Sequence, residues 1–329
     1  MTLANRFIFG GSNRSIFDCV NFVSKSVAIG RPVIAMNMNY RVGFGGFLAS
    51  KDILEDMKKD GLEGVGNFAL TDQQTGLEWV QEYLPGLGGD KDNVTVFGLS
   101  AGGISIGNQL RAKRPPVFHR AIEMSGVAQT GPSMSLAEHE EIYQDVLKYF
   151  NIDGSSCDAL EKLRSIPQLE LANASVPIYY GKGVMPSPCE DGVFHTTPPT
   201  LDSFLPPPNW LKSYMAGNVR DEGQIFVGHL TKPKEYHWLK DCYCQYMTAA
   251  DAEFVLELYG LKPNADHSRC LRFVSEMFGD YKFGIPLRKN LEHASSTTKS
   301  YGYHFDLVRK SFLLSFLFSF FGLASRETN

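Results

Sequence analysis

The sequence predicts an α/β fold in which helices cover both faces of a mostly parallel sheet. Runs rich in β-branched and aromatic residues alternate with segments whose apolar residues recur at helical spacing. With 43% hydrophobic and 21% charged residues, the 329-residue chain can bury a large core. Its net charge of −4 excludes a polybasic nucleic-acid binder, so we expect no nucleic-acid partner.

The first third of the chain contains two predicted strands and a helix between them. Pro32–Met38 is a β-rich apolar run that predicts a buried strand. The spacing of apolar residues predicts a helix over Leu70–Tyr83, capped by Thr71 and ended by several glycines. A second strand is expected at Asn93–Phe97, and a tight glycine-rich turn and another helix follow it directly.

The rest of the chain continues the alternation, and its proline-rich stretches at 186–188 and 198–208 predict surface loops or an inserted cap. The strands are predicted at 121–125, 214–219 and 299–307, and the helices at 136–150, 157–165, 249–259 and 268–278. Two of the six cysteines, Cys242 and Cys244, are close in sequence, but one intervening residue does not make a zinc-binding CxxC. We therefore expect no metal and no cofactor.

Gly98-Leu99-Ser100-Ala101-Gly102 matches the GxSxG pattern of a nucleophile elbow. A serine on a sharp strand-to-helix turn needs small neighbours two residues away, so that the backbone can fold back without clashes. Gly98 and Gly102 satisfy this need, and the Ser100 hydroxyl would then project above the sheet. The Ala101 N–H, at the start of the following helix, could stabilise an oxyanion.

Together with this turn, a series of short motifs resembles the type-B carboxylesterase and lipase family of the α/β-hydrolase fold. The motifs, in chain order, are Phe9–Ser12, Asn39–Gly43, Gly46–Leu48, Gly66-Asn67, Asp72-Gln73, Leu77–Val80, Gly88–Asp90, Val94–Gly98, Ser100–Gly103, Ser125-Gly126, Asp221–Gly223 and Gly279-Asp280. The resemblance implies an α/β-hydrolase sheet with inserted cap helices and a serine carboxylic ester hydrolase acting on small-molecule or lipid esters. It also implies that Ser100 is the nucleophile and Glu222, in Asp221-Glu222-Gly223, the triad acid.

The sequence departs from the family pattern at the position of the catalytic histidine. The family's histidine follows the late strand that Tyr301–Phe305 matches, and no histidine follows that strand here. Five histidines come after Glu222, and we expect all five to be packing or surface residues: His229, His237, His267, His293 and His304. No catalytic histidine is identified.

The two ends of the chain also differ from the family. Leu3, Ala4, Asn5 and Arg6 occupy the place of its Gly-rich oxyanion loop, and its first strands would come earlier still. We expect residues 1–310 to form an incomplete hydrolase domain and 311–329 to form an apolar tail. Its apolar run, 312–324, is shorter than the roughly 20 residues of a spanning helix, so membrane insertion is not expected.

Three hypotheses remain open from the sequence. The chain is an ester hydrolase with an impaired site, a catalytically inactive cholinesterase-like binding module, or a gene-model fragment. The absence of a signal peptide leaves its compartment unassigned. Without a histidine base, we expect the chain to hydrolyse a short p-nitrophenyl ester no faster than a Ser100→Ala variant.

Overall fold

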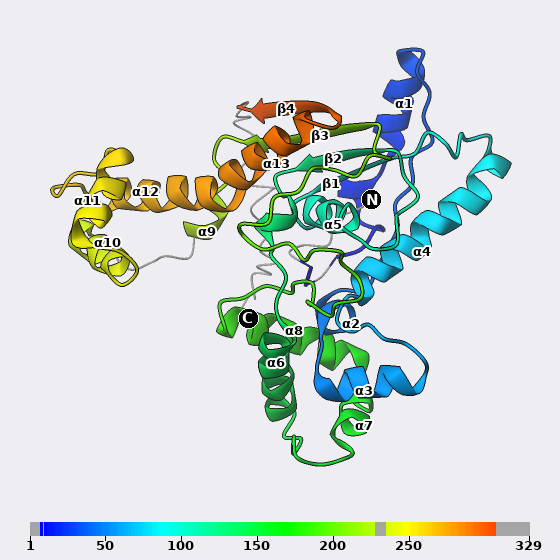
Figure 1. Ribbon diagram of the computed structural model, residues 1–329, viewed down its shortest axis with the longest axis horizontal. Coiled ribbons are helices and arrows are strands. Elements are labelled where there is room, and N and C mark those ends of the chain that lie inside the picture. Colours follow the sequence, from blue (N-terminus) through cyan, green and yellow to red (C-terminus); the bar gives the residue numbers. More distant parts are fainter. Residues whose placement is uncertain (1–6, 9, 228–234, 307–329) are drawn as a thin grey trace, which may run out of the picture.

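The computed structural model describes residues 7, 8, 10–227 and 235–306, and its centre is a parallel sheet (Figure 1). The strands, in sheet order, are β1 (Thr95–Leu99), β2 (Arg120–Met124), β3 (Ser213–Val219) and β4 (Lys299–Phe305). Every neighbouring pair is parallel, so all carboxyl ends lie at one edge. The predicted α/β class and these four strand positions are confirmed.

One face of the sheet is covered by three helices: α4 (Phe68–Tyr83), α5 (Ala101–Gln109) and α13 (Ile285–Ser295). Alternate strand residues point toward them and form the main core, which contains Leu77, Val96, Ile106, Ala121, Tyr214, Ala216 and Leu287 among others. On the opposite face, α1 (Val20–Ala28) reaches the sheet through Phe22, whose ring lies 5.9 Å from that of Phe97.

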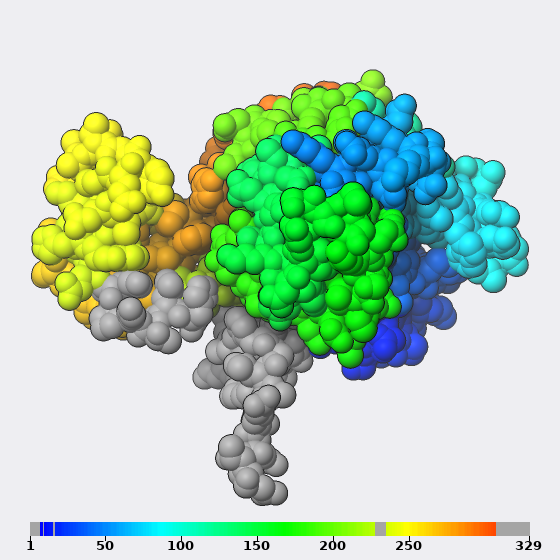
Figure 2. All heavy atoms as spheres, turned by 90° about the horizontal axis from the view of Figure 1, so that it is seen from below, coloured from blue at the N-terminus to red at the C-terminus, as the bar shows by residue number. Residues whose placement is uncertain are grey.

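Two helical lobes extend from this body. The first contains α2 (Gly43–Phe47), α3 (Lys51–Lys59), α6 (Leu136–Tyr149), α7 (Ala159–Arg164) and α8 (Gln168–Gly181). The second, between β3 and β4, contains α9 (Gln224–Val227), α10 (Tyr236–Cys244), α11 (Ala249–Leu258) and α12 (His267–Gly279), followed by a π-helical turn at Asp280–Gly284. Figure 2 shows the α10–α11 part of the second lobe standing apart from the first. Short 3₁₀ turns lie at Ser15–Phe17, Leu84–Leu87 and Ala128–Thr130.

Polar side chains define where several of these helices begin. The Ser135 hydroxyl accepts a hydrogen bond from the Glu138 N–H at 3.2 Å, and the Glu138 carboxylate accepts one from the Ser135 N–H. Together the two bonds form a capping box at the start of α6. Ser50, Thr248 and Asp266 cap α3, α11 and α12 in the simpler way, through the side chain alone.

Several local predictions are wrong. The segment 31–42 contains no strand, and Val33 and Ile34 keep 40% and 48% of their surface exposed. An apolar run becomes a buried strand only where another strand pairs with it, and in the described part of the chain none does. Helix α4 begins at Phe68, one turn before the expected cap, so Thr71 lies inside it and its hydroxyl donates to the Phe68 carbonyl.

The sequence pattern also missed the helices α1, α2, α3, α8, α9, α10 and α13. The residues Leu3–Arg6 and the apolar run 312–324 lie outside the described residues. Within the described ranges, no helix combines the length and apolar character needed to cross a bilayer.

Candidate active site

Ser100 occupies a strained turn between the end of β1 at Leu99 and the start of α5 at Ala101. Its φ of 54° and ψ of −117° are uncommon for a residue with a side chain. The Ser100 N–H donates to the Met124 carbonyl at 2.7 Å, and its carbonyl accepts the Ile104 N–H at 2.9 Å. Because both the N–H and the carbonyl of Ser100 form hydrogen bonds, the turn is fixed. The Ser100 side chain is half-buried at the edge of the sheet.

The glycines around Ser100 are required by close backbone contacts. A Cβ added to Gly98 would lie 2.5 Å from the carbonyl carbon of Gly102. A Cβ on Gly126 would lie 2.7 Å from the Ser100 carbonyl oxygen, and one on Gly103 would lie 2.2 Å from that of Gly126. The elbow glycines therefore permit strand, turn and helix to touch through their backbones.

We expect Gly98→Ala to lower the free energy of unfolding by about 1–3 kcal/mol, because the added methyl group meets backbone that cannot move aside. Urea denaturation measures the change. Gly45→Ala in α2 is the matched control, since nothing lies within 4 Å of its added Cβ, and it should be neutral or slightly stabilising. Equal effects of the two substitutions would contradict the close-contact explanation.

The Ala101 N–H has the position expected of an oxyanion donor. It is the first N–H of α5, so it has no acceptor within the helix and lies at the positive end of the helix dipole. Ala101 is 1% exposed and packs in a cluster with Phe7, Phe47 and Ile104. Phe7 therefore brings the start of the described chain into the same hydrophobic cluster as Ala101.

The parallel register aligns the residues at the carboxyl edge of the sheet. Leu99 pairs with Met124, and Met124 pairs with Gly217. Ser100, Ser125 and Asn218 therefore stand in one row, which His304 extends on β4 opposite Asn218. With about 4.8 Å between neighbouring strands, Ser100 lies about 14 Å from the His304 position.

Glu222 follows β3 at this same edge. One of its carboxylate oxygens accepts the Val219 N–H at 2.8 Å. Burial raises the pKa of Glu222, while the Val219 N–H, the Ser125 side chain and the charge of His304 each act in the opposite direction. The neighbouring Asp221 is exposed and forms a 2.9 Å ion pair with Arg220, so it is the more solvated of the two acids.

Gly223 fixes the turn that holds Glu222 against the second lobe. A Cβ on Gly223 would lie 1.8 Å from the Ser275 carbonyl oxygen of α12. Gly279, at the end of α12, faces the same turn, since its added Cβ would be 3.8 Å from the Glu222 Cβ. The Asp221–Gly223 and Gly279-Asp280 motifs thus meet in space, and they line one pocket together with His304.

The described histidines do not connect Ser100 with Glu222. His304 is exposed and its Nδ1 bonds the Asn218 side chain at 2.9 Å. His293 on α13 bonds the Lys289 carbonyl at 2.8 Å and stacks on Phe204. His237 lies on α10 and His267 begins α12, while His229 is outside the described residues.

Sequence reasoning missed a buried polar cluster on the α5 side of the sheet. Glu123 is 1% exposed and bonds the Tyr214 hydroxyl, and Arg111 at the end of α5 is 8% exposed. The signal available in the sequence was a glutamate at an inward-facing position of the strand Arg120–Met124, where an apolar residue is expected.

Comparison with known proteins identifies relatives of one kind. A sequence model of the carboxylesterase family matches residues 5–315. Lipase 4 of Diutina rugosa is 37% identical over 89% of this chain and 57% of its own length. Secreted lipase 1 of Botryotinia fuckeliana is 33% identical over 67% of this chain and 40% of its own. The chain spans about half the length of the curated relatives it matches.

Solved structures support the same fold. A carboxylesterase of Geobacillus stearothermophilus superposes with a TM-score of 0.73 at 24% identity, covering 94% of this chain and 61% of that one. A second neighbour, a PNB esterase, has a TM-score of 0.71 at 24% identity over 94% of this chain and 60% of its own. The predicted α/β-hydrolase fold is confirmed.

Proposed function

Because the chain belongs to the carboxylesterase family, we propose that it carries the chemistry of carboxylic ester hydrolysis. Ser100 is the nucleophile, the Ala101 N–H is an oxyanion donor and Glu222 is the acid that orients a base. The observation that carries the proposal is the strained Ser100 turn, since φ of 54° is maintained by the contacts of three glycines. The substrates are small-molecule or lipid esters.

The reaction proceeds in two steps, acylation of Ser100 and hydrolysis of the acyl-serine. The Ser100 oxygen attacks the ester carbonyl carbon, its proton passes to the leaving alcohol, and an acyl-serine forms. Water then attacks the acyl-serine, the bond to the Ser100 oxygen breaks and the carboxylic acid leaves, while one proton of the water passes to the Ser100 oxygen. In both steps the negative charge that develops on the carbonyl oxygen lies near the Ala101 N–H.

A proton carrier is needed between the two side chains. Ser100 follows β1 and Glu222 follows β3, and β2 lies between these two strands. The strands are therefore about 10 Å apart in total. This is more than one hydrogen bond spans, and no described histidine lies between them. An imidazole placed there would accept the Ser100 proton and donate its other N–H to Glu222.

Added imidazole tests this arrangement. We expect imidazole to raise the hydrolysis of p-nitrophenyl butyrate by the chain at least about tenfold above that of Ser100→Ala under the same conditions, below the 10²–10⁴ of a positioned base. Ser100→Ala measures the hydrolysis by imidazole alone. Glu222→Gln should lose most of the gain, whereas the matched variant Asp221→Asn should keep it.

Equal rates for the chain and Ser100→Ala at every imidazole concentration would contradict the assignment of Ser100. A gain that survives Glu222→Gln would contradict only the role of Glu222. The named relatives are lipases and esterases, which does not favour the binding-module alternative.

A further inference from the structure

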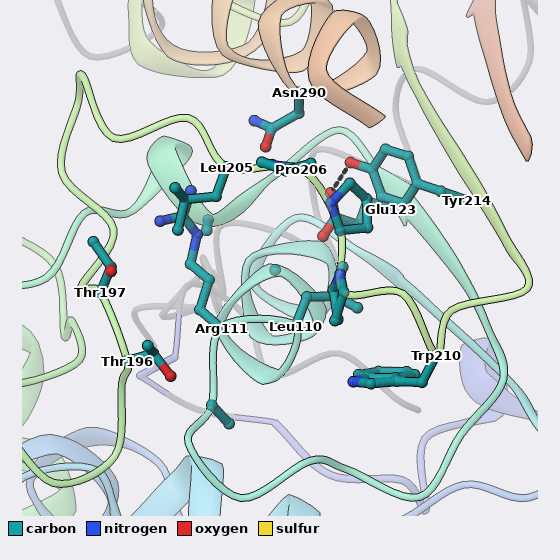
Figure 3. A pocket seen from close by; sticks show the side chains of 15 residues that line it. Leu110, Arg111, Glu123, Thr196, Thr197, Leu205, Pro206, Trp210, Tyr214 and Asn290 are labelled. Carbon is teal, nitrogen blue, oxygen red and sulfur yellow. Dashed lines mark hydrogen bonds between the residues drawn. The ribbon is translucent and has the colours of Figure 1, made fainter. Parts of the chain in front are cut away.

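A second pocket lies at the end of α5 that is opposite Ser100. Nine residues of α5 separate its two ends by about 13 Å, so this pocket is distinct from the Ser100 turn. It is closed by α13 and by the loop before β3. Its lining includes Arg111, Glu123, Leu205, Trp210, Tyr214 and Asn290 (Figure 3).

Arg111 is a buried cation in this pocket that forms no ion pair with any described carboxylate. It is 8% exposed, and its guanidinium donates to the hydroxyl of Ser203 at 3.2 Å and to the Ser203 carbonyl. Burial lowers its pKa to about 10, so it is still charged at neutral pH. Glu123 attracts it electrostatically, yet within the described part of the chain the two form no ion pair. Two acceptors leave part of the five-donor guanidinium available.

Glu123 offers a hydrogen-bonding group beside this cation. One carboxyl oxygen bonds the Tyr214 hydroxyl, which Figure 3 marks with a dashed line, and the other is buried with no partner among the described residues. Burial raises the pKa of Glu123 to about 8, so the group is mostly a neutral acid at pH 7. A neutral carboxyl can donate a hydrogen bond. Gly107 lies close to the unpartnered oxygen, since a Cβ added to it would be only 3.0 Å away, so a larger residue at this position would crowd the Glu123 carboxyl group.

The remaining wall of the pocket is apolar. Leu110, Leu205 and the indole of Trp210 line it, together with three consecutive prolines, Pro206–Pro208. Leu205 is 41% exposed, so it lies at the rim of the pocket. The pocket thus joins a buried cation, a hydrogen-bond donor and an apolar surface.

We propose that this pocket binds an aliphatic carboxylate, with the carboxylate on Arg111 and Glu123 and the alkyl chain against Leu110, Leu205 and Trp210. The carboxylate supplies the negative charge that buried Arg111 lacks and accepts the hydrogen bond that the free Glu123 oxygen can donate. The site goes beyond the proposed hydrolysis and does not depend on it.

Octanoate is the probe, titrated calorimetrically at pH 7 into the Ser100→Ala variant of the full chain. This background excludes acylation of Ser100, so the result is independent of hydrolysis. We expect one octanoate to bind, octanol to bind at least about tenfold more weakly, and Arg111→Met to weaken octanoate by at least about tenfold. Arg114→Met is the matched control, since Arg114 is exposed and pairs with Glu78, and it should leave affinity unchanged.

A second variant keeps the test decisive if Arg111→Met folds poorly. Leu205→Trp adds bulk at the partly exposed rim of the pocket and should also abolish binding. Absence of octanoate binding to the parent variant would overturn the proposal. So would binding that neither Arg111→Met nor Leu205→Trp changes, because octanoate would then lie elsewhere.

The role of Glu123 has its own readout. The charged or titratable groups that act on Glu123 are Arg111, two residues beyond the end of α5, and Tyr214 from β3. When Glu123 ionises it loses its proton and repels a carboxylate, so octanoate affinity should fall between pH 7 and pH 9. Glu123→Gln keeps a donor at all pH values and should remove this fall. An equal fall in both proteins would overturn the part assigned to Glu123.

Discussion

Without added imidazole, the 329-residue chain is expected to hydrolyse p-nitrophenyl butyrate no faster than its Ser100→Ala variant. A serine hydroxyl is a weak nucleophile at neutral pH and needs a base within hydrogen-bond reach. His304 stands in the same row as Ser100 but three strands away, about 14 Å. Loss of a triad member typically reduces turnover by about 10⁴–10⁶, and loss of the base costs about as much as loss of the serine. The chain and its Ser100→Ala variant should therefore share the same residual rate.

Initial rates for the chain and the Ser100→Ala variant, measured side by side at pH 7–8, check this expectation. Turnover that clearly exceeds the background and disappears in Ser100→Ala would contradict it. Alanine substitutions at His229, His237, His267, His293 and His304 would then show which side chain serves as the base. His229 is the one of these five that lies outside the described residues.

The stability of the protein is expected to fall by about 1–2 kcal/mol between pH 6.5 and pH 8 because of Glu123. Burial raises the pKa of Glu123 from 4.5 to about 8 in the folded protein. In this window the unfolded chain has released the proton while the folded chain still binds most of it. Stability therefore decreases with pH by about 1.4 kcal/mol per unit near pH 6.5 and by about half of that near pH 8, where Glu123 is half ionised. Glu222, whose pKa is also raised, has an effect of the same sign between its unfolded and folded pKa values.

Below pH 6.5 a buried histidine opposes this trend. Burial lowers the pKa of His195 from 6.5 to about 4, so the unfolded chain binds the proton more readily and stability rises with pH there. The two groups are therefore best separated between pH 6.5 and pH 8. Urea denaturation at several pH values measures the slope.

Glu123→Gln should flatten the slope, because the amide does not titrate. Glu82→Gln on the exposed surface of α4 is the matched control and should leave the slope as it is. Identical slopes for Glu123→Gln and the parent protein would show that Glu123 is already ionised at pH 6.5.

Local sequence patterns predicted the part of the site that depends on adjacent residues. The turn at Ser100 is determined by a β-rich run, two flanking glycines and an apolar helix, all within about 20 residues. The strands β2, β3 and β4 were recognised in the same way. Pro32–Met38 has an equally strong pattern, but whether such a run pairs depends on neighbours that the pattern does not contain.

Local sequence patterns also failed to predict the polar cluster in the second pocket. Arg111, Glu123 and Tyr214 come from a helix end and two strands, and about 100 positions separate the first from the last. No motif relates them, and only Glu123 carries a signal of its own, as a charged residue at an inward-facing strand position. Burial by the fold creates their interaction and their shifted pKa values.

The parallel sheet also has a kinetic consequence. About 20 residues connect β1 to β2, whereas about 90 connect β2 to β3 and about 80 connect β3 to β4. Pairing the distant strands costs the conformational entropy of closing long chain segments before any stabilising contact has formed. This cost slows folding. The Ser100 turn, with β1, α5 and β2, can therefore assemble early, while Glu222 and the α5-side cluster that needs Tyr214 form only when β3 docks.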